Sequence, residues 1–474
     1  MANVFCVRTV AVMFASVMVP ALADAALRAG AAKVDITPPM GVSLDGSISK
    51  NGPATSIHDP LHARALVLQD GDSKIAIVVV DQCMTAAEVF DAAKRQVSSE
   101  IGMPVEQMLM AATHTHAAPR TIHIGRSELD DRYHKYVSAR IADAVLQAFE
   151  NLAPAQVGYA AFERPELLAC RRFLCVPGSV GANPFGHSGE RIKSVAGSSS
   201  QVIEPAGPID PQFSVLSVQH LDGTPLCLLG NFSVHYCGGY QRGAVSADYF
   251  GYFCSAIEAS LAGETDHPDV VGIMSNGTSG DSGAFQRGSA KRFAPFEGMQ
   301  FYGRMLAEQA IVAADAVQHR SDISVAMVES ELELQLRRPD EQQLRWAKNV
   351  LANPELKQPH RWTKIYATEA QHLAQYPATE TLKLQAIRIG DIAIAAAPCE
   401  VFAETGLAIK KESPIKQTFN MELSNGYGGY LPTRLQHELG GYESWAARSS
   451  KLEVGAEAKI RVELLRLLNE VAKQ

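Results

Sequence analysis

An apolar run that ends in alternating threonine and histidine constrains this chain most strongly. Met108-Leu109-Met110-Ala111-Ala112 has the composition of a buried strand that ends at Thr113, and His114-Thr115-His116 straddles that end. Side chains alternate along a strand with a period of two, so both imidazoles should point to the same side. Two converging imidazoles suit a borderline-soft cation such as zinc, and the competing interpretation is a pair of polar histidines that only cap a strand.

Length and composition describe a soluble globular protein with a large core. The chain has 474 residues, of which 46% are hydrophobic and 20% charged. The net charge is −8 and no basic stretch is present, which argues against nucleic acid as a partner.

The N-terminus predicts export. Arg8 precedes an apolar stretch over 10–20, and Ala21-Leu22-Ala23 has the pattern of a cleavage site, so we expect a signal peptide over 1–23. A membrane anchor is disfavoured because the apolar stretch is too short to span a bilayer, and no later segment approaches that length. The mature chain, 24–474, is then a periplasmic or secreted protein. Its seven cysteines are an odd number, so we expect mostly small buried thiols, with a local Cys170–Cys175 bridge left open.

Hydrophobic periodicity predicts strands and helices that alternate through the mature chain. A fold of the α/β class (mixed α+β) follows, as one large catalytic domain with mixed sheets flanked by helices and an active site at strand ends. The stretch 176–207 is rich in Gly, Ser and Pro and follows Arg171-Arg172, so we expect a long loop or flap. The predicted strands are 64–69, 74–81, 213–219, 226–234, 270–274, 324–336, 381–389 and 391–397, and the predicted helices are 85–101, 133–151, 249–261, 298–318, 339–352, 363–375 and 451–472.

Two further candidate ligands also follow apolar strands. His235 closes the strand 226–234 and precedes a glycine-rich turn, and Glu400 follows the apolar strand 391–397. Taken singly, each residue has an ordinary structural explanation. Three potential ligands from three strand ends fit the open, three-ligand pattern of a catalytic zinc site.

At this point the chain resembles a known family, the neutral (non-lysosomal) ceramidases, over their N-terminal catalytic domain. The resemblance spans nearly the whole mature chain, and its motifs occur in order. They are Val34-Asp35-Ile36-Thr37, Ala112-Thr113-His114-Thr115-His116, Asn231-Phe232-Ser233-Val234-His235, Pro398-Cys399-Glu400 in place of the family's Pro-Gly-Glu, and Asn425-Gly426-Tyr427-Gly428-Gly429-Tyr430-Leu431-Pro432-Thr433.

The resemblance implies a set of roles for these residues. It implies a zinc site made by His114, His235, Glu400 and, unusually, Tyr430. Tyr442 lies twelve positions after Tyr430, which matches the family's spacing to a second tyrosine near the scissile amide. His116 is expected beside the metal, where it orients the substrate or shuttles a proton.

An arginine of the family's Asn-Arg motif is matched by Arg171, with Cys170 in place of the asparagine, and its neighbour Arg172 is an equally plausible candidate. In chemical terms, zinc polarises a carbonyl and lowers the pKa of bound water. Tyr442 or Arg171 would then stabilise the developing oxyanion.

The chain departs from the family at the position of the nucleophilic serine. The family's Gly-Asp-Val-Ser-Pro-Asn is replaced here by Ser275-Asn276-Gly277-Thr278-Ser279-Gly280-Asp281-Ser282-Gly283. An alignment without a gap on Ser275-Asn276 puts Asp281 at the position of the serine, and an alignment of the two Gly-Asp pairs puts Gly283 there, next to Ser282. Asp281 is the favoured catalytic candidate, as a general base to water, and Ser279 and Ser282 are lesser candidates. The chain also ends soon after its last helix, without room for the family's C-terminal β-sandwich, which puts ceramide itself in doubt.

The leading hypothesis is an exported, zinc-dependent amidohydrolase that cleaves an N-acyl bond of a small-molecule or lipid-like substrate. Attack by water and attack by a side chain both stay open. The alternatives are a hydrolase of a non-ceramide amide or ester, and a non-catalytic, metal-stabilised protein that binds a glycolipid or polysaccharide. His116 and Tyr442 argue against the non-catalytic alternative, since neither is needed to hold zinc.

Overall fold

The computed structural model describes residues 27–44, 52–122, 124, 129–194, 200–262, 270–284, 293–355 and 357–474. The predicted signal peptide, 1–23, lies outside this range. Within it, every helix is too short or too polar to cross a lipid bilayer.

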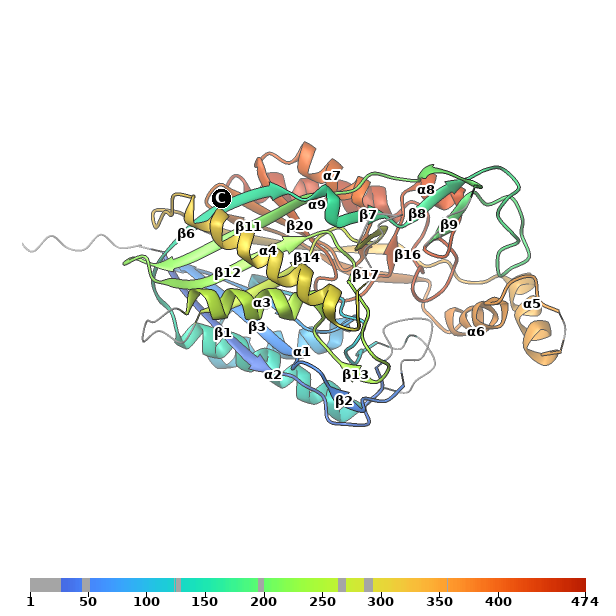
Figure 1. Cartoon of the computed structure of the whole chain (residues 1–474), viewed down its shortest axis with the longest axis horizontal. Coiled ribbons are helices and arrows are strands. Elements are labelled where there is room, and N and C mark those ends of the chain that lie inside the picture. Colours follow the sequence, from blue (N-terminus) through green and yellow to red (C-terminus); the bar gives the residue numbers. More distant parts are fainter. Residues whose placement is uncertain are drawn as a thin grey trace, which may run out of the picture.

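The larger sheet has eight strands in the order β14-β12-β11-β6-β1-β3-β4-β5 (Figure 1). Neighbouring strands are parallel at its two edges, β4 with β5 and β12 with β14, and antiparallel between. The strands are β1 (Arg28–Asp35), β3 (His62–Asp70), β4 (Ser73–Val80), β5 (Met108–Ala112), β6 (Ala153–Glu163), β11 (Gln212–His220), β12 (Pro225–Phe232) and β14 (Val271–Asn276).

A second sheet has the order β16-β17-β18-β20, with β18 and β20 parallel. Its strands are β16 (Val325–Gln335), β17 (Thr379–Ile389), β18 (Ile392–Ala396) and β20 (Gln417–Met421). Short strands form the remaining pairings: β8 (Arg172–Cys175) between β9 (Ile192–Ser194) and β10 (Val202–Pro205), β2 (Ser56–Ile57) with β13 (Ala244–Val245), β7 (Leu168–Cys170) with β15 (Ser282–Ala284), and β19 (Glu400–Val401) with β21 (Tyr430–Leu431).

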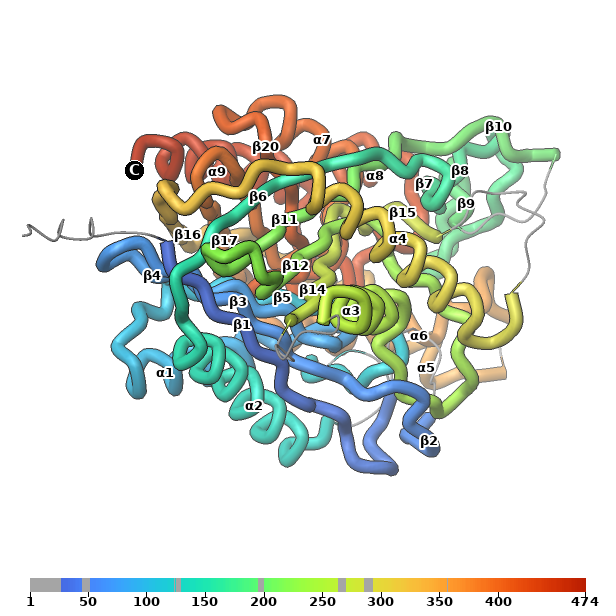
Figure 2. The backbone as a smooth tube through the Cα atoms, turned by 60° about the vertical axis from the view of Figure 1, so that its left-hand side comes forward, coloured from blue at the N-terminus to red at the C-terminus, as the bar shows by residue number. Residues whose placement is uncertain are grey.

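Helices cover the outer faces of both sheets (Figures 1 and 2). One pair, α1 and α2, packs together beside β1 and β3, a second pair, α3 and α4, packs beside β14 and β11, and α9 packs on β16 and β17. The helices are α1 (Ala87–Ile101), α2 (Asp131–Glu150), α3 (Asp248–Leu261), α4 (Glu297–Asp315), α5 (Glu341–Ala352), α6 (Thr363–Leu373), α7 (Ala403–Glu412), α8 (Arg434–Leu439) and α9 (Ala456–Val471).

Strand alternation divides the core into a central cluster and outer clusters. Along β3, Leu66 and Leu68 face the central cluster, which also contains Ile387 and Ile394 of the second sheet. The alternating residues of β3, such as Ala65, face the cluster under α1 and α2 instead. The two sheets therefore share one apolar interior, which fixes the ends of their strands relative to each other.

The two edges of the larger sheet meet where its parallel strands end. Although β14 and β5 stand at opposite ends of the strand order, β14 contacts β3, β4 and β5. The chain after β20 bridges the two edges. The Glu422 amide donates to Asn276 O (3.2 Å), the Ala112 amide donates to Leu423 O (3.2 Å), and the Asn425 amide donates to Met110 O (2.7 Å). The carboxyl ends of β5, β14 and β20 consequently share one location.

The predicted fold class is confirmed, as are all the strands and helices predicted from periodicity, with shifted ends. The elements missed include β6, a central strand rich in alanine, the strand β20, the short helices α7 and α8, and most of the short two- to four-residue strands. The final helix begins at Ala456 rather than Lys451. The stretch 176–207 contains β9 and β10, which pair with β8, so it is not wholly a loop. The seven described cysteines are free thiols and six of them are buried.

The close packing of β14 on α3 gives a test of this arrangement. A Cβ on Gly272 would lie 2.6 Å from Cys254 O and 2.7 Å from Cys254 Cα, so Gly272→Ala forces the helix and strand apart. We expect a loss of about 1–3 kcal/mol in the free energy of unfolding, measured by urea denaturation. Gly181→Ala is the matched control, because nothing lies within 4 Å of that Cβ. Equal stability of both variants would contradict the packing.

Candidate metal centre and active site

Three buried side chains bring their donor atoms together where the strands end. His114 Nε2 lies 3.0 Å from His235 Nε2, and Glu400 Oε2 lies 3.5 Å and 3.7 Å from these two nitrogens. The relative exposure of each of these residues is 2% or less. In a tetrahedral site with ligand bonds of 2.0–2.2 Å, donor atoms stand roughly 3.3–3.6 Å apart. The three sequence-predicted ligands therefore have the spacing of a metal site.

The two histidines have their tautomers fixed by backbone carbonyls. His114 Nδ1 lies 2.7 Å from Cys83 O, and His235 Nδ1 lies 3.2 Å from Ser279 O. A carbonyl only accepts, so both Nδ1 atoms carry hydrogen and both Nε2 atoms present lone pairs. Metal-bound histidines are typically oriented in this way by a partner on the other ring nitrogen.

Glu400 supplies a charged oxygen to the same point. Its Oε1 accepts a hydrogen bond from the Tyr427 hydroxyl (2.6 Å), whereas its buried Oε2 makes no hydrogen bond with the described residues. Burial raises its pKa, but His114, Tyr427 and Arg171 lower it by more, so the carboxylate is ionised. Tyr427 was not predicted as a site residue, although it lies in the glycine-rich motif that contains Tyr430.

The donor set fits a divalent cation. Two imidazole lone pairs and an unpaired carboxylate oxygen facing one another in a buried site repel unless a positive charge lies between them. Burial lowers the pKa of His114, but Cys83 and Glu400 raise it well above its ordinary value, so this cluster attracts a proton. Two imidazoles and one carboxylate are also a ligand set that zinc prefers.

The backbone conformation at His114 and His116 differs from that of a simple strand end. β5 ends at Ala112, and His114 has a φ of 74°, in the left-handed region. His116 Nε2 nevertheless lies 3.2 Å from His114 Nε2. The predicted convergence of the imidazoles is present, but a turn at His114 produces it rather than strand alternation.

His116 lies beside the three ligands and stacks on a second aromatic ring. Its ring centroid is 3.9 Å from that of Tyr236, with an interplanar angle of 18°. Burial lowers the pKa of His116 well below its ordinary value, and the neighbouring His114 lowers it further. A neutral imidazole in this position is able to accept a proton, and Tyr236 fixes its plane.

Tyr430 is held next to Glu400 by strand pairing. β19 and β21 are parallel, with Glu400 opposite Tyr430. The Tyr430 hydroxyl accepts a hydrogen bond from Arg171 Nη2 (3.1 Å). Burial, and secondly the negative charge of Glu400, raise the pKa of Tyr430 well above its ordinary value. Arg171 lowers this pKa by less than burial and Glu400 raise it, so the predicted ligand role requires the further charge of a metal cation to make the phenolate accessible.

Arg171 and Tyr442 complete one wall of the site. The Arg171 guanidinium lies 5.6 Å from the ring centres of both Tyr430 and Tyr442, and these two rings are 5.7 Å apart. Arg171 also donates to Gly280 O (2.8 Å). The two residues that the sequence proposed as oxyanion donors therefore lie together beside Tyr430.

Arg172, the alternative to Arg171, points into the protein. It is fully buried, donates to Gln436 Oε1 (3.1 Å) and Gly440 O (2.7 Å), and forms an ion pair with Glu443. Adjacent residues of an extended segment point to opposite sides, which separates the roles of the two arginines. Arg172 secures the loop that carries Tyr442.

The environment of Asp281 differs from the one expected for the predicted role of general base. Its Oδ1 accepts a hydrogen bond from the amide of Ala403 (2.9 Å), the first residue of α7, and its backbone carbonyl accepts one from the Arg171 amide (2.8 Å). The described contacts do not join its carboxylate to the histidines. Burial raises the pKa of Asp281 to about 7. An acid at a helix N-terminus is a common structural anchor.

Ser279 lies behind His235 and is tied to a buried acid that the sequence did not single out. The Ser279 hydroxyl donates to Glu422, and the amides of Ser279 (3.1 Å) and Val401 (2.8 Å) both donate to Glu422 Oε2. Glu422 therefore joins the carbonyl that orients His235 to the strand that carries Glu400. Ser282 is also fully buried.

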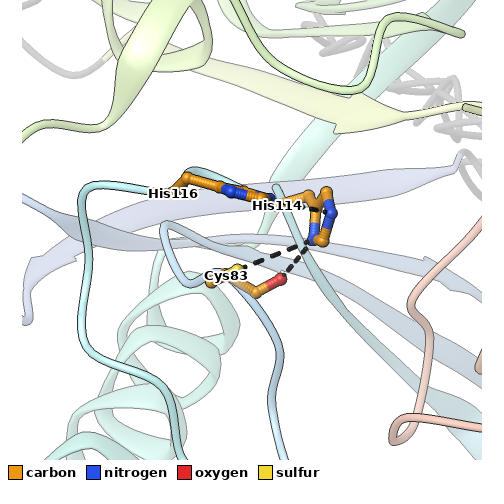
Figure 3. A group of neighbouring side chains, drawn as sticks. All are labelled: Cys83, His114 and His116. Atoms are coloured by element: carbon orange, nitrogen blue, oxygen red, sulfur yellow. Dashed lines mark hydrogen bonds between the residues drawn. The ribbon is translucent and has the colours of Figure 1, made fainter. Parts of the chain in front are cut away.

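Cys83 forms a second possible cluster with His114 and His116 (Figure 3). Its Sγ lies 3.9 Å from His114 Nδ1, the nitrogen already bonded to Cys83 O. The thiol therefore lies near Nδ1 of the His114 ring and not near Nε2. We assign the metal position to the Nε2 side, where His235 and Glu400 converge.

Comparison with known proteins gives a likeness in structure. No protein-family model matches the sequence, and no curated protein sequence matches it. Neutral ceramidase from Pseudomonas aeruginosa superposes with a TM-score of 0.67 at 17% identity, over 94% of this chain and 74% of that one. A ceramidase complexed with C2 gives 0.68 at 18%, over 95% and 76%. The chain has the neutral ceramidase fold. The resemblance stated from the sequence motifs is confirmed at the level of fold.

Removing the Glu422 carboxyl tests its role within this ceramidase fold. Glu422→Ala leaves the amides of Ser279 and Val401 without an acceptor, and we expect a loss on the order of 1–3 kcal/mol per unpaired group. Glu422→Gln keeps an acceptor oxygen and should lose much less, in agreement with a pKa that burial raises to about 8. Urea denaturation and zinc titration of both variants provide the readout. Equal damage in both would show that the negative charge, and not the hydrogen bonding, is required.

The pH dependence of stability tests the role of Asp281. The pKa in the folded state, about 7, exceeds the ordinary 3.8, so ionisation opposes folding and stability falls as pH rises between these values. Asp281→Asn keeps an acceptor for Ala403 and should remove this part of the pH dependence in urea denaturation. If Asp281 is instead the general base, the variant would also lose turnover by about 10²–10⁴-fold, whereas an anchoring role leaves turnover of the folded variant within a few-fold of wild type.

Proposed function

We propose that this protein is an exported, zinc-dependent hydrolase that cleaves the amide bond of an N-acyl substrate. The observation that carries the proposal is the convergence of the two Nε2 lone pairs and the unpaired Glu400 oxygen within 3.7 Å of one another. The neutral ceramidase fold supports the reaction class, since both similar structures are described as ceramidases. Export rests on the pattern at the N-terminus, Arg8 followed by an apolar stretch and Ala21-Leu22-Ala23.

The site residues would have separate roles in such a reaction. His114, His235 and Glu400, with Tyr430 as the fourth ligand, would hold the zinc ion, which supplies Lewis acidity for a carbonyl and lowers the pKa of water. Tyr442 and Arg171 would donate hydrogen bonds to the carbonyl oxygen as negative charge develops on it. His116 would accept a proton beside the three ligands.

Water is the nucleophile that these surroundings favour. Ser279 and Ser282 are fully buried, and the Ser279 hydroxyl is engaged by Glu422. Asp281 is engaged by the N-terminus of α7. The neutral imidazole of His116, adjacent to the ligands, is the better-placed group to remove a proton from water.

Activity and zinc content, measured together, test this proposal. Glu400→Gln should lower zinc affinity and reduce kcat/KM for N-acyl amides on the order of 100-fold or more. Tyr442→Phe should keep the zinc and lower kcat by about 10²-fold, since it loses only an oxyanion donor. Glu412→Gln, on the exposed end of α7, is the matched control.

Two results would contradict the account. Failure of the zinc-loaded wild type to cleave any N-acyl amide, across short and long acyl chains, would reject the proposed reaction. Loss of zinc from Tyr442→Phe to the same degree as from Glu400→Gln would remove Tyr442 from its role and place it among the ligands.

A further inference from the structure

All three tryptophans of the chain lie in one aromatic cluster. Trp362 and Trp445 have ring centres 6.2 Å apart, and Tyr366 lies 5.3 Å from Trp445. Phe185 then joins Tyr366 (5.6 Å) to Trp346 (5.4 Å). These residues come from α5, α6, the connection between these helices and two loops that are far apart in sequence, so their meeting is a product of the tertiary fold.

The cluster begins at the candidate active site. Tyr430, the proposed fourth ligand, contacts Tyr442, and the Tyr442 ring lies 6.2 Å from that of Trp362, at an interplanar angle of 82°. Trp362 is therefore separated from the proposed metal ligands by two ring contacts. A substrate group that extends from the scissile bond past Tyr442 would next meet Trp362.

Partly and fully buried polar contacts hold the cluster in place. Glu190 accepts hydrogen bonds from the Trp445 indole (2.8 Å) and from the Gly441 amide (3.0 Å). Arg448 binds Glu369 of α6 through two nitrogens, at 2.9 Å and 2.6 Å. These anchors fix both the loop that carries Tyr442 and the helix that follows Trp362, so the rings form a preorganised surface.

The chemistry of this surface favours an apolar ligand. Trp362, Trp445 and Tyr442 are each partly exposed, which leaves aromatic carbon in contact with water. The indole N–H of Trp445 is already satisfied within the protein. Covering exposed aromatic carbon with hydrocarbon is favourable in proportion to the area removed from water.

We propose that Trp362 is a specificity-determining residue that packs against an apolar chain of the N-acyl substrate. This inference rests on the proposed amide hydrolysis and names the part of the substrate that the enzyme selects. This apolar chain belongs either to the acyl group or to the amine of the substrate. Varying the length of each group independently distinguishes these two possibilities.

Two substrate series with the zinc-loaded enzyme test the inference. In one the acyl chain has two to twelve carbons with a fixed amine, and in the other the amine chain is varied with a fixed acetyl group. We expect kcat/KM of the wild type to rise with length in one series. Trp362→Ala should reduce the long-to-short ratio by about tenfold, through KM, while Trp362→Phe keeps part of it.

Trp346→Ala is the matched control, because Trp346 lies at the far end of the cluster and should leave the ratio unchanged. Equal ratios in the Trp362→Ala and wild-type enzymes would overturn the inference, as would an equal loss in both alanine variants. A wild type that cleaves amides without any dependence on length would overturn it while leaving the proposed function intact.

A binding measurement keeps the inference testable if no amide is cleaved. Since the tryptophans all lie in the cluster, titration with dodecanoate or dodecylamine should change the intrinsic fluorescence of the wild type, and Trp362→Ala should lose the change while Trp346→Ala keeps it. An unchanged wild-type spectrum with both probes would overturn the inference independently of catalysis.

Discussion

The structure depends on two imidazole lone pairs that face each other 3.0 Å apart inside the protein. Cys83 O and Ser279 O fix the opposite nitrogens as hydrogen donors, so neither ring can relieve the repulsion by changing its tautomer. Glu400 adds a negative charge at the same point. A buried arrangement of this kind is stable only around a positive charge, and the surrounding fold is what holds it together.

One segment after β20 connects most of this arrangement. Glu422 ties the Ser279 loop to the strand of Glu400, the backbone of Leu423 and Asn425 pairs with β5, and Tyr427 bonds Glu400. Leu423 and Asn425 have positive φ values of 54° and 60°, as His114 does at 74°. Backbone strain of this sort is retained where a site requires a particular geometry, and here it lies on both sides of the junction between β5 and β20.

The sequence predicts much of this fold, because strong periodicity marks its main strands and helices. The strand β6 was not predicted, although it is central to the sheet, because its alanine, glycine and glutamine residues have little preference for β-strands. The sequence also missed α7 and β20, which are short. Tertiary contacts decided these elements, and local propensity did not.

The candidate ligands were predictable because histidine and glutamate after apolar strands are unusual. Tyr427, Tyr236 and Glu422 were not, since a tyrosine or glutamate in the sequence gives no sign that it will be buried against a ligand. The choice between Arg171 and Arg172 also required coordinates, because both lie in the same extended segment. Asp281 was favoured by alignment, whereas its environment is that of an anchor for α7.

The central claim is that His114, His235 and Glu400 hold one zinc ion. Anomalous X-ray scattering at the zinc absorption edge, from a crystal of the purified protein, tests it directly. The account predicts a single strong peak about 2.0–2.2 Å from both Nε2 atoms and a Glu400 oxygen, with Tyr430 as the fourth protein ligand. A zinc-supplemented crystal without a peak between these residues, or with its peak coordinated by other side chains, would contradict it.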